Sequence, residues 1–183
     1  MGFALEKDLL PRYTYDEYIL WEGNWELIEG IPYSMSPSPS FKHQRITASL
    51  ITQLEEKLKA CGHCKALPPF DWKIDENTVV QPDISVICEP VNNQNFLDFA
   101  PEIIFEIISP SSVLRDRKIK FALYQSEGVK YYVLADPETE TIEIYEFFNT
   151  AYRKMAAFSS GDFDFVLKDE CKIAFQFKHL WTA

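Results

Sequence analysis

Residues 102–109 read EIIFEIIS, and this stretch decides the fold. Apart from Glu106, its interior is apolar on both faces, which is typical of a strand buried in the middle of a sheet. Pro110 ends the strand, a helix is predicted over residues 113–127, and a second buried strand follows at residues 129–135. This order predicts a sheet with a helix packed against it.

The rest of the chain predicts a second, longer helix and further strands around this unit. Residues 41–60 carry Ile46, Leu50, Leu54 and Leu58 on one helical face, and Gly62 can cap the helix. A short helix is predicted at residues 13–21. Strands are predicted at residues 25–34, with a turn at Glu29 and Gly30, and at residues 70–74, 79–88 and 141–148. The predicted fold class is α/β (α+β): a mixed central sheet flanked by helices, with extra antiparallel strands at the N- and C-termini.

Composition indicates one ordinary globular domain, residues 1–183. The chain has 183 residues, of which 46% are hydrophobic and 25% are charged, and a domain of this size needs no disulfide or metal to fold. The formal net charge of −10 disfavours a protein that binds nucleic acid by bulk attraction, since phosphate binding needs a basic surface. Residues 111–130, however, carry five basic and two acidic side chains, a local basic cluster of net charge +3.

Membrane insertion and secretion are not expected. No apolar run reaches the 18 or so residues of a membrane span, and residues 1–10 lack the apolar core of a signal peptide. The expected location is the cytoplasm. The four cysteines are therefore expected to be reduced thiols; they are Cys61, Cys64, Cys88 and Cys171.

Two acidic residues belong to neighbouring predicted strands. Asp83 follows Pro82 and opens one strand, and Glu106 lies inside the stretch quoted above. A carboxylate in such apolar surroundings costs several kcal/mol unless it is paired or bound to a metal. One interpretation is a salt bridge at the sheet rim. The other is a Mg²⁺ site, because Mg²⁺ is held by one or two carboxylates. We expect both carboxylates side by side at one end of the sheet.

The predicted helix that follows adds polar residues on a single face. Asp116, Lys120 and Tyr124 are spaced at i, i+4 and i+8, so they lie above one another. Taken alone, Asp116 and Lys120 form an ordinary ion pair. Loss of Lys120 is therefore expected to cost under about 1 kcal/mol of stability.

The order of these motifs resembles a large bacterial family of restriction endonucleases, mostly uncharacterised, within the PD-(D/E)XK nuclease superfamily. The resemblance is carried by QPDISVI, FEIISPSS, the Asp116–Lys120–Tyr124 spacing, GVKYYVLADP and an opening segment WELIEGIPYSMSPSPSFKH at residues 25–43. It implies a restriction-endonuclease-like core over roughly residues 13–176.

The resemblance also implies a catalytic site. It implies Asp83 and Glu106 as ligands of Mg²⁺ or Mn²⁺, and metal-assisted hydrolysis of phosphodiester bonds, with DNA as the expected partner. The superfamily lysine would fall at position 108, which is Ile108 here, and Lys120 replaces it. The supporting residues are Glu26, His43, Asp116 and Tyr124, although His43 could equally be a core histidine. The residues expected to bind nucleic acid are Arg115, Arg117, Lys118, Lys42 and Arg45.

Two alternative functions stay open on the sequence. The displaced lysine and the net negative charge fit a weakly active or inactive nuclease-fold protein that binds DNA or has a regulatory role. The motif Cys61-Gly-His-Cys64 is that of thiol oxidoreductases, but it follows a helix instead of opening one, so the dipole has the wrong sign. A zinc site there would need a fourth ligand that the local sequence lacks. The aromatic-rich second half either covers its own core or forms a homodimer interface; it includes Tyr145, Phe147, Phe148 and Tyr152.

Overall fold

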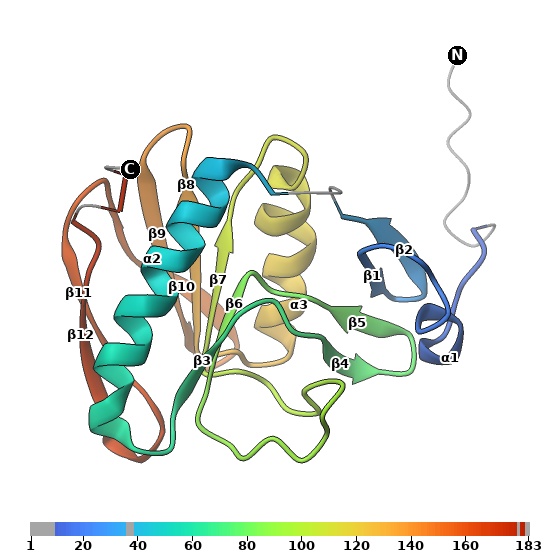
Figure 1. The fold of residues 1–183 in the computed structure, drawn as a ribbon, viewed down its shortest axis with the longest axis horizontal. Coiled ribbons are helices and arrows are strands. Elements are labelled where there is room, and N and C mark those ends of the chain that lie inside the picture. Colours follow the sequence, from blue (N-terminus) through green and yellow to red (C-terminus); the bar gives the residue numbers. More distant parts are fainter. Residues whose placement is uncertain (1–9, 36–38, 179, 182–183) are drawn as a thin grey trace.

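A six-stranded mixed sheet forms the centre of the molecule (Figure 1). The computed structural model describes residues 10–35, 39–178 and 180–181, so residues 36–38 of the opening segment and residues 1–9 lie outside it. β7 and β8 are parallel, and every other neighbouring pair is antiparallel. The strand order is β10 (Ala151–Phe158), β9 (Thr141–Phe148), β8 (Tyr131–Asp136), β7 (Ile103–Ile107), β6 (Ile84–Ile87) and β3 (Lys65–Leu67). The predicted fold class is confirmed.

The central strand β7 sends alternate side chains to two separate cores, because successive side chains of a strand point to opposite faces. Ile103 and Phe105 pack on the side covered by α2 (Phe41–Leu58) and by the hairpin of β11 (Asp162–Val166) and β12 (Lys172–Gln176). Ile104 and Ile108 pack on the side covered by α3 (Phe121–Ser126) (Figure 1). By this alternation Glu106 faces the α3 side.

A smaller sheet supplies one wall of the site. Its order is β2 (Ile31–Ser34), β1 (Trp25–Ile28), β5 (Thr78–Val80), β4 (Trp72–Asp75). The turn between β1 and β2 has φ of 52° at Glu29 and 78° at Gly30, as a two-residue hairpin requires. The single strand predicted at residues 79–88 was wrong: β5 belongs to the small sheet and β6 to the central one. Pro82 lies between them and has no N–H to donate to a ladder.

Several helical segments differ from the prediction. The helix at residues 13–21 is reduced to α1 (Tyr15–Tyr18), and α2 ends in η2 (Lys59–Cys61), with Gly62 as the cap at φ 64°. The helix predicted at residues 113–127 begins at residue 113, widens into a π-helical turn, η3 (Arg115–Lys120), and continues as α3. A further short turn, η4 (Lys168–Glu170), joins β11 to β12. Among the described residues, no helix has the length and apolar character of a membrane span.

The cysteines form two disulfides in the structure, Cys61–Cys171 and Cys64–Cys88. The expectation of four reduced thiols was therefore wrong for this structure. Chain positions far apart in sequence meet here because α2 packs on β12, which follows Cys171, and because β3, which follows Cys64, pairs with β6, which precedes Cys88. The two cysteines of the C-x-x-C motif each bond a different partner, whereas a redox motif of this type requires them to bond each other.

The aromatic residues of the second half pack mainly against α3. The ring of Phe121 lies 4.9 Å from Tyr145 and 5.1 Å from Tyr152, and Phe147 lies 6.1 Å from Tyr152, measured between ring centroids. These residues cover their own core, as one of the two interpretations predicted. Phe148 is 53% exposed. A homodimer stays a prediction.

Candidate active site

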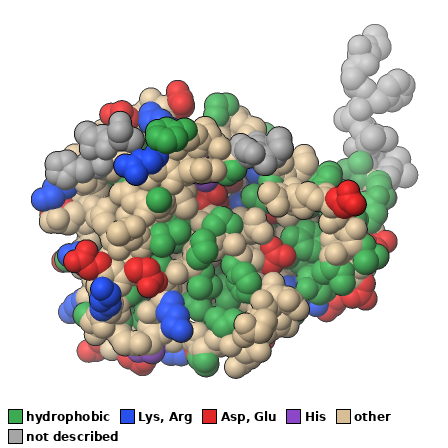
Figure 2. All heavy atoms as spheres, viewed as in Figure 1, with side chains coloured by type: hydrophobic (Ala, Val, Ile, Leu, Met, Phe, Trp, Pro, Cys, Tyr) green, Lys and Arg blue, Asp and Glu red, His purple; other side chains and the backbone are tan. Residues whose placement is uncertain are grey.

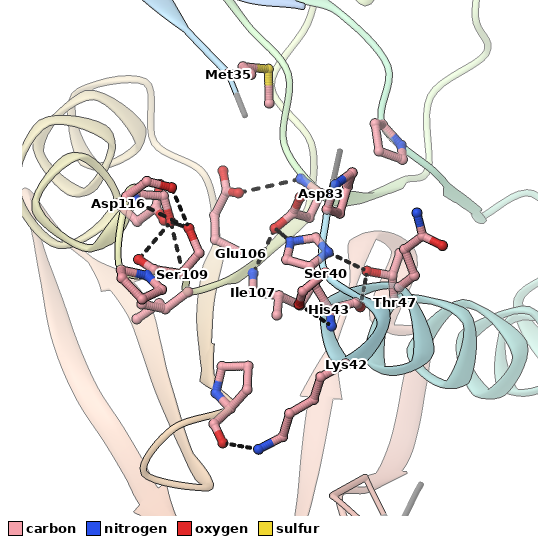
Figure 3. Close-up of a pocket in the computed structure, with 18 of the residues that line it drawn as sticks. Met35, Ser40, Lys42, His43, Thr47, Asp83, Glu106, Ile107, Ser109 and Asp116 are labelled. Carbon is pink, nitrogen blue, oxygen red and sulfur yellow. Dashed lines mark hydrogen bonds and ion pairs between the residues drawn. The ribbon is translucent and has the colours of Figure 1, made fainter. Parts of the chain in front are cut away.

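Asp83 and Glu106 are neighbours at one end of the central sheet. Ile84 of β6 pairs with Phe105 of β7, so Asp83 and Glu106 follow as the next opposite positions. Oδ2 of Asp83 accepts a hydrogen bond from the backbone N–H of Ile107 at 2.7 Å, and Oε2 of Glu106 lies 3.4 Å from the backbone N–H of Asp83 (Figure 3). Each carboxylate is therefore oriented by the other residue's strand, as the predicted side-by-side arrangement requires.

Lys120 reaches into this cluster from η3. Its Nζ lies 2.6 Å from Oε1 of Glu26, 2.8 Å from Oε1 of Glu106 and 4.0 Å from Oδ1 of Asp116. The side chain is 1% exposed. The expected stability cost of under about 1 kcal/mol applies to an exposed ion pair, so it does not suit this buried one. The superfamily position, Ile108, is instead buried among the apolar residues on the α3 side.

Glu26 is a full member of the cluster. It is 0% exposed in the middle of β1, and its Oε1 accepts a hydrogen bond from the backbone N–H of Gln81 at 3.0 Å. Its second oxygen, Oε2, is buried without a hydrogen bond in the described structure, 3.3 Å from Nε of Arg115. Tyr124 completes the set, because its hydroxyl donates to Oε1 of Glu106 at 3.0 Å.

His43 belongs to the site rather than to the core. Its Nε2 lies 3.1 Å from Oδ2 of Asp83, and both side chains are 15% exposed. The ring is held in the first turn of α2, where the backbone N–H of His43 donates to the capping side chain of Ser40 at 3.2 Å (Figure 3). The pairing of His43 with the same carboxylate oxygen that Ile107 orients argues against a core histidine.

Asp116 faces the cluster together with Lys120 because the two residues are four apart in the π-helical turn η3. π-turns are rare, occur mostly as single turns inside α-helices, and are frequent at functional sites. The carbonyl of Asp116 accepts a hydrogen bond from the buried hydroxyl of Tyr132 at 3.0 Å. Asp116 is itself 2% exposed, and burial raises the pKa of its carboxyl while Lys120 opposes the rise.

The cluster carries more negative than positive charge. Four carboxyl groups, those of Glu26, Asp83, Glu106 and Asp116, face the two permanent cations Lys120 and Arg115, which leaves an excess of two negative charges if all are ionised. Burial raises the pKa of Glu106 well above its ordinary value, and the neighbouring acids add to this while Lys120 opposes it. Burial alone would lower the pKa of Lys120, but Glu106, Glu26 and Asp116 outweigh it and raise that pKa.

This donor set fits a hard divalent cation. The excess of negative charge, when all four carboxyl groups are ionised, is what a cation would compensate. No described residue donates a hydrogen bond to Oδ1 of Asp83, and Oε2 of Glu106 has only the long contact to a backbone N–H. Two carboxylates at the wall of an open pocket, each with an oxygen that lacks a strong hydrogen bond, are typical of a Mg²⁺ site.

The pocket over these carboxylates has a volume of about 730 Å³ and lies between α2, the end of β7 and η3. In Figure 2 acidic, basic and histidine side chains meet in a hollow beside the part that carries α1, β1 and β2. Lys42 and Arg115, two of the five basic residues expected to bind nucleic acid, line it, and Nζ of Lys42 donates to the carbonyl of Pro137 at 2.5 Å.

The other three basic residues lie away from the pocket. Arg45 and Lys118 are exposed and outside its lining, and Arg117 points to β9, where it donates to Glu143 at 2.7 Å. The expected convergence of all five on the cleft does not occur in this structure. The side chain of Lys118 is exposed whereas that of Lys120 is buried, as expected for residues two apart, which lie on opposite faces of a helix.

Sequence reasoning missed several lining residues. Gln81 supplies its backbone N–H to Glu26, and its side chain donates to Asp71 at 3.0 Å. Ser109 and Ser112 line the pocket with a hydroxyl-to-hydroxyl hydrogen bond of 3.1 Å. The signal for the serines was the SPSS run directly after the buried strand, where their hydroxyls face the pocket. Gln81 had no signal beyond its place before Pro82.

The Arg117–Glu143 contact predicts a pH-dependent contribution to stability. Burial would raise the pKa of Glu143, but hydrogen bonds from Lys154, Tyr145 and Arg117 outweigh it and lower the pKa to about 2. A lowered folded-state pKa stabilises the protein above the unfolded-state pKa, and this stability is lost as the pH falls towards 2. Glu143→Gln should therefore cost about 1–2 kcal/mol at pH 7, since Arg117 and Lys154 stay partly in solvent.

Urea denaturation of both proteins from pH 7 to pH 2.5 measures this effect. The difference in unfolding free energy should shrink as the pH falls below about 5. The exposed Glu127→Gln is the matched control and should show little difference at any pH. A Glu143→Gln difference that is constant with pH would rule out the charge as its cause.

The fold and the site combine a mixed sheet with a cluster of acidic side chains at one end of it. Residues 15–164 match the family Uma2, described as "Putative restriction endonuclease", and the chain belongs to this family. It is also similar to "Uncharacterized protein slr1290" of Synechocystis sp., with 29% identity over 145 residues that cover 74% of each chain.

A solved structure shares the fold. The chain is similar to the crystal structure of a "putative nuclease belonging to DUF820" from Anabaena variabilis, with a TM-score of 0.74. The match covers 92% of this chain and 97% of that one at 20% sequence identity. At this identity the likeness shows the fold alone.

Proposed function

We propose that this chain is a metal-dependent endonuclease that hydrolyses phosphodiester bonds in nucleic acid, with DNA as the preferred substrate. The observation that carries the proposal is the cluster of Asp83, Glu106 and buried Lys120 in the wall of an open pocket. Membership of Uma2 supports the same class of activity.

In this proposal Asp83 and Glu106 hold Mg²⁺ or Mn²⁺. The ion would polarise the scissile phosphate and lower the pKa of a bound water. Lys120 fixes the orientation of Glu106 and Glu26, and as the cation nearest the carboxylates it stabilises the negative charge that builds up during attack. His43 orients Asp83 through the contact of its Nε2 with Oδ2 of that carboxylate, and the buried hydroxyl of Tyr124 donates to Glu106.

The chain's other pocket residues bind the substrate in this proposal. Lys42 and Arg115 supply positive charge at the pocket, and the hydroxyls of Ser109 and Ser112 can donate to phosphate oxygens. Because Arg117 is bound to Glu143, it contributes to the fold rather than to the substrate.

A weakly active or inactive binding protein of the same fold is the second candidate. Its specific support is that Arg45, Lys118 and Arg117 lie away from the pocket, in a protein of net charge −10. A site with few cations binds polyanions weakly, and its affinity depends steeply on salt.

A cleavage and binding panel separates the two candidates. Supercoiled DNA, linear duplex, single-stranded DNA and RNA are incubated with the protein in Mg²⁺ and in Mn²⁺, and a gel-shift assay runs in parallel. We expect cleavage of DNA above that of RNA in at least one metal. Binding without cleavage of any substrate would support the inactive binding protein and reject the proposal.

A further inference from the structure

A second cluster of metal-ligating side chains lies at the other end of α2. This helix has 18 residues and is about 27 Å long, so its first turn carries His43 and its far end lies well away from the pocket. Ligand atoms of His63, Cys64 and Cys88 all lie within 4.8 Å of one another. None of these residues lines the pocket over Asp83 and Glu106.

The sheet register brings this set together. Lys65 pairs with Ile87 where β3 joins β6, so Cys64 and Cys88 are the next residues across the edge of the central sheet, with a Cα–Cα distance of 4.0 Å. Both side chains are buried, at 6% and 7% exposure, whereas His63 is exposed at the edge. The fold therefore adds Cys88, which comes 24 residues after Cys64, as a ligand that the C-x-x-C motif alone does not supply.

The histidine has a partner of its own. Nε2 of His63 lies 3.4 Å from Oδ2 of Asp169 in η4. A carboxylate on one ring nitrogen is the usual arrangement for a metal-binding histidine, because it fixes the ring orientation and raises ligand basicity. The Cys61–Cys171 disulfide lies next to this set and joins the end of η2 to the residue that follows η4.

We propose that His63, Cys64 and Cys88 form a site for a thiolate-binding divalent cation of the Zn²⁺ type when Cys64 and Cys88 are reduced. Zn²⁺ is bound by cysteine thiolates and histidine nitrogen in tetrahedral sites, and C-x-x-C is a common spacing for it. His63, Cys64 and Cys88 supply three ligands, so the fourth tetrahedral position would be taken by water or another small ligand.

Conversion of the Cys64–Cys88 disulfide into the metal-binding dithiol needs a reductant. A dithiol reductant gives two electrons and two protons to the Cys64–Cys88 bond, and is itself oxidised to a disulfide. Two thiols result, and binding of the cation releases both thiol protons because only thiolates are ligands. The oxidised state cannot bind the cation through these sulfurs, so disulfide and metal exclude each other.

Cobalt titration tests this site, because Co²⁺ bound to thiolates has a charge-transfer absorption that carboxylate sites lack. The full chain is reduced with a phosphine, which takes up oxygen from water as it cleaves the disulfides, and is then titrated with Co²⁺ without oxygen. We expect one equivalent with the thiolate band, displaced by Zn²⁺, and no band for the oxidised protein. His63→Ala should weaken binding at least ~10-fold, by the loss of a ligand.

Two variants make the outcome decisive. Cys88→Ser should abolish the band, whereas Asp83→Asn should keep it, which separates this site from the proposed active site. Circular dichroism of each reduced protein checks folding. If Cys88→Ser does not fold, His63→Ala still tests the site, because His63 is exposed and its replacement should leave the fold intact. A reduced wild type without the thiolate band, or a band that survives in folded Cys88→Ser or is unchanged in His63→Ala, would overturn the proposal.

Discussion

Replacing Lys120 with methionine is expected to lower the free energy of unfolding by about 3–5 kcal/mol, because this one cation forms ion pairs with three buried carboxyl groups. Lys120 is 1% exposed and lies within 4.0 Å of Glu26, Glu106 and Asp116. Methionine has a similar shape and can fill the space, so the loss would come from leaving Glu26 and Glu106 unpaired. Urea or thermal denaturation at pH 7 measures it.

Lys118→Met is the matched control for this change. Lys118 lies in the same π-helical turn but is exposed, so its replacement should alter stability by no more than about 0.5 kcal/mol. Equal effects of the two substitutions would show that Lys120 does not pair the buried acids in solution.

Asp83→Asn is expected to lower the rate of DNA cleavage by about 10³-fold, which corresponds to the several kcal/mol that a metal contributes to a hydrolytic transition state. Asparagine keeps the shape and one oxygen for the N–H of Ile107, so the site should stay folded. What is lost is a charged metal ligand. The rate is measured on the best substrate of the panel, at saturating Mg²⁺ or Mn²⁺.

An exposed acid far from the pocket provides the comparison. Asp164→Asn on β11 removes the same charge from the protein without touching the site, and its rate should match the wild type. If Asp83→Asn cleaves as fast as Asp164→Asn, then Asp83 is not a ligand of a catalytic metal.

Periodicity predicted the centre of this fold well. The buried strand around Glu106, the helix with Ile46, Leu50, Leu54 and Leu58, and the strand Thr141–Phe148 all form where alternation or helical spacing placed them. The errors lie where backbone geometry outweighs side-chain pattern. Pro82 divides an apparently continuous strand between two sheets, and the turn at Arg115–Lys120 widens into a π-helix that no spacing rule predicts.

The site was predictable only in part, for a related reason. Glu106 stands out as a charge in an apolar strand, and the placement of Lys120 near it came from the resemblance to a family. The burial of Lys120 and the destinations of Arg117 and Cys88 depend on contacts between distant segments. Arg117 could equally have faced the pocket, because its partner Glu143 comes from a strand 26 residues later. The disulfide partners are 24 and 110 residues apart.

Metal removal tests the central claim most directly. The wild-type protein is stripped with EDTA, assayed for DNA cleavage, and assayed again after Mg²⁺ or Mn²⁺ is added back. If Asp83 and Glu106 hold a catalytic divalent cation, cleavage stops in EDTA and returns with the added metal. Cleavage that persists in EDTA, or a protein that cleaves no nucleic acid with either metal, would contradict the account.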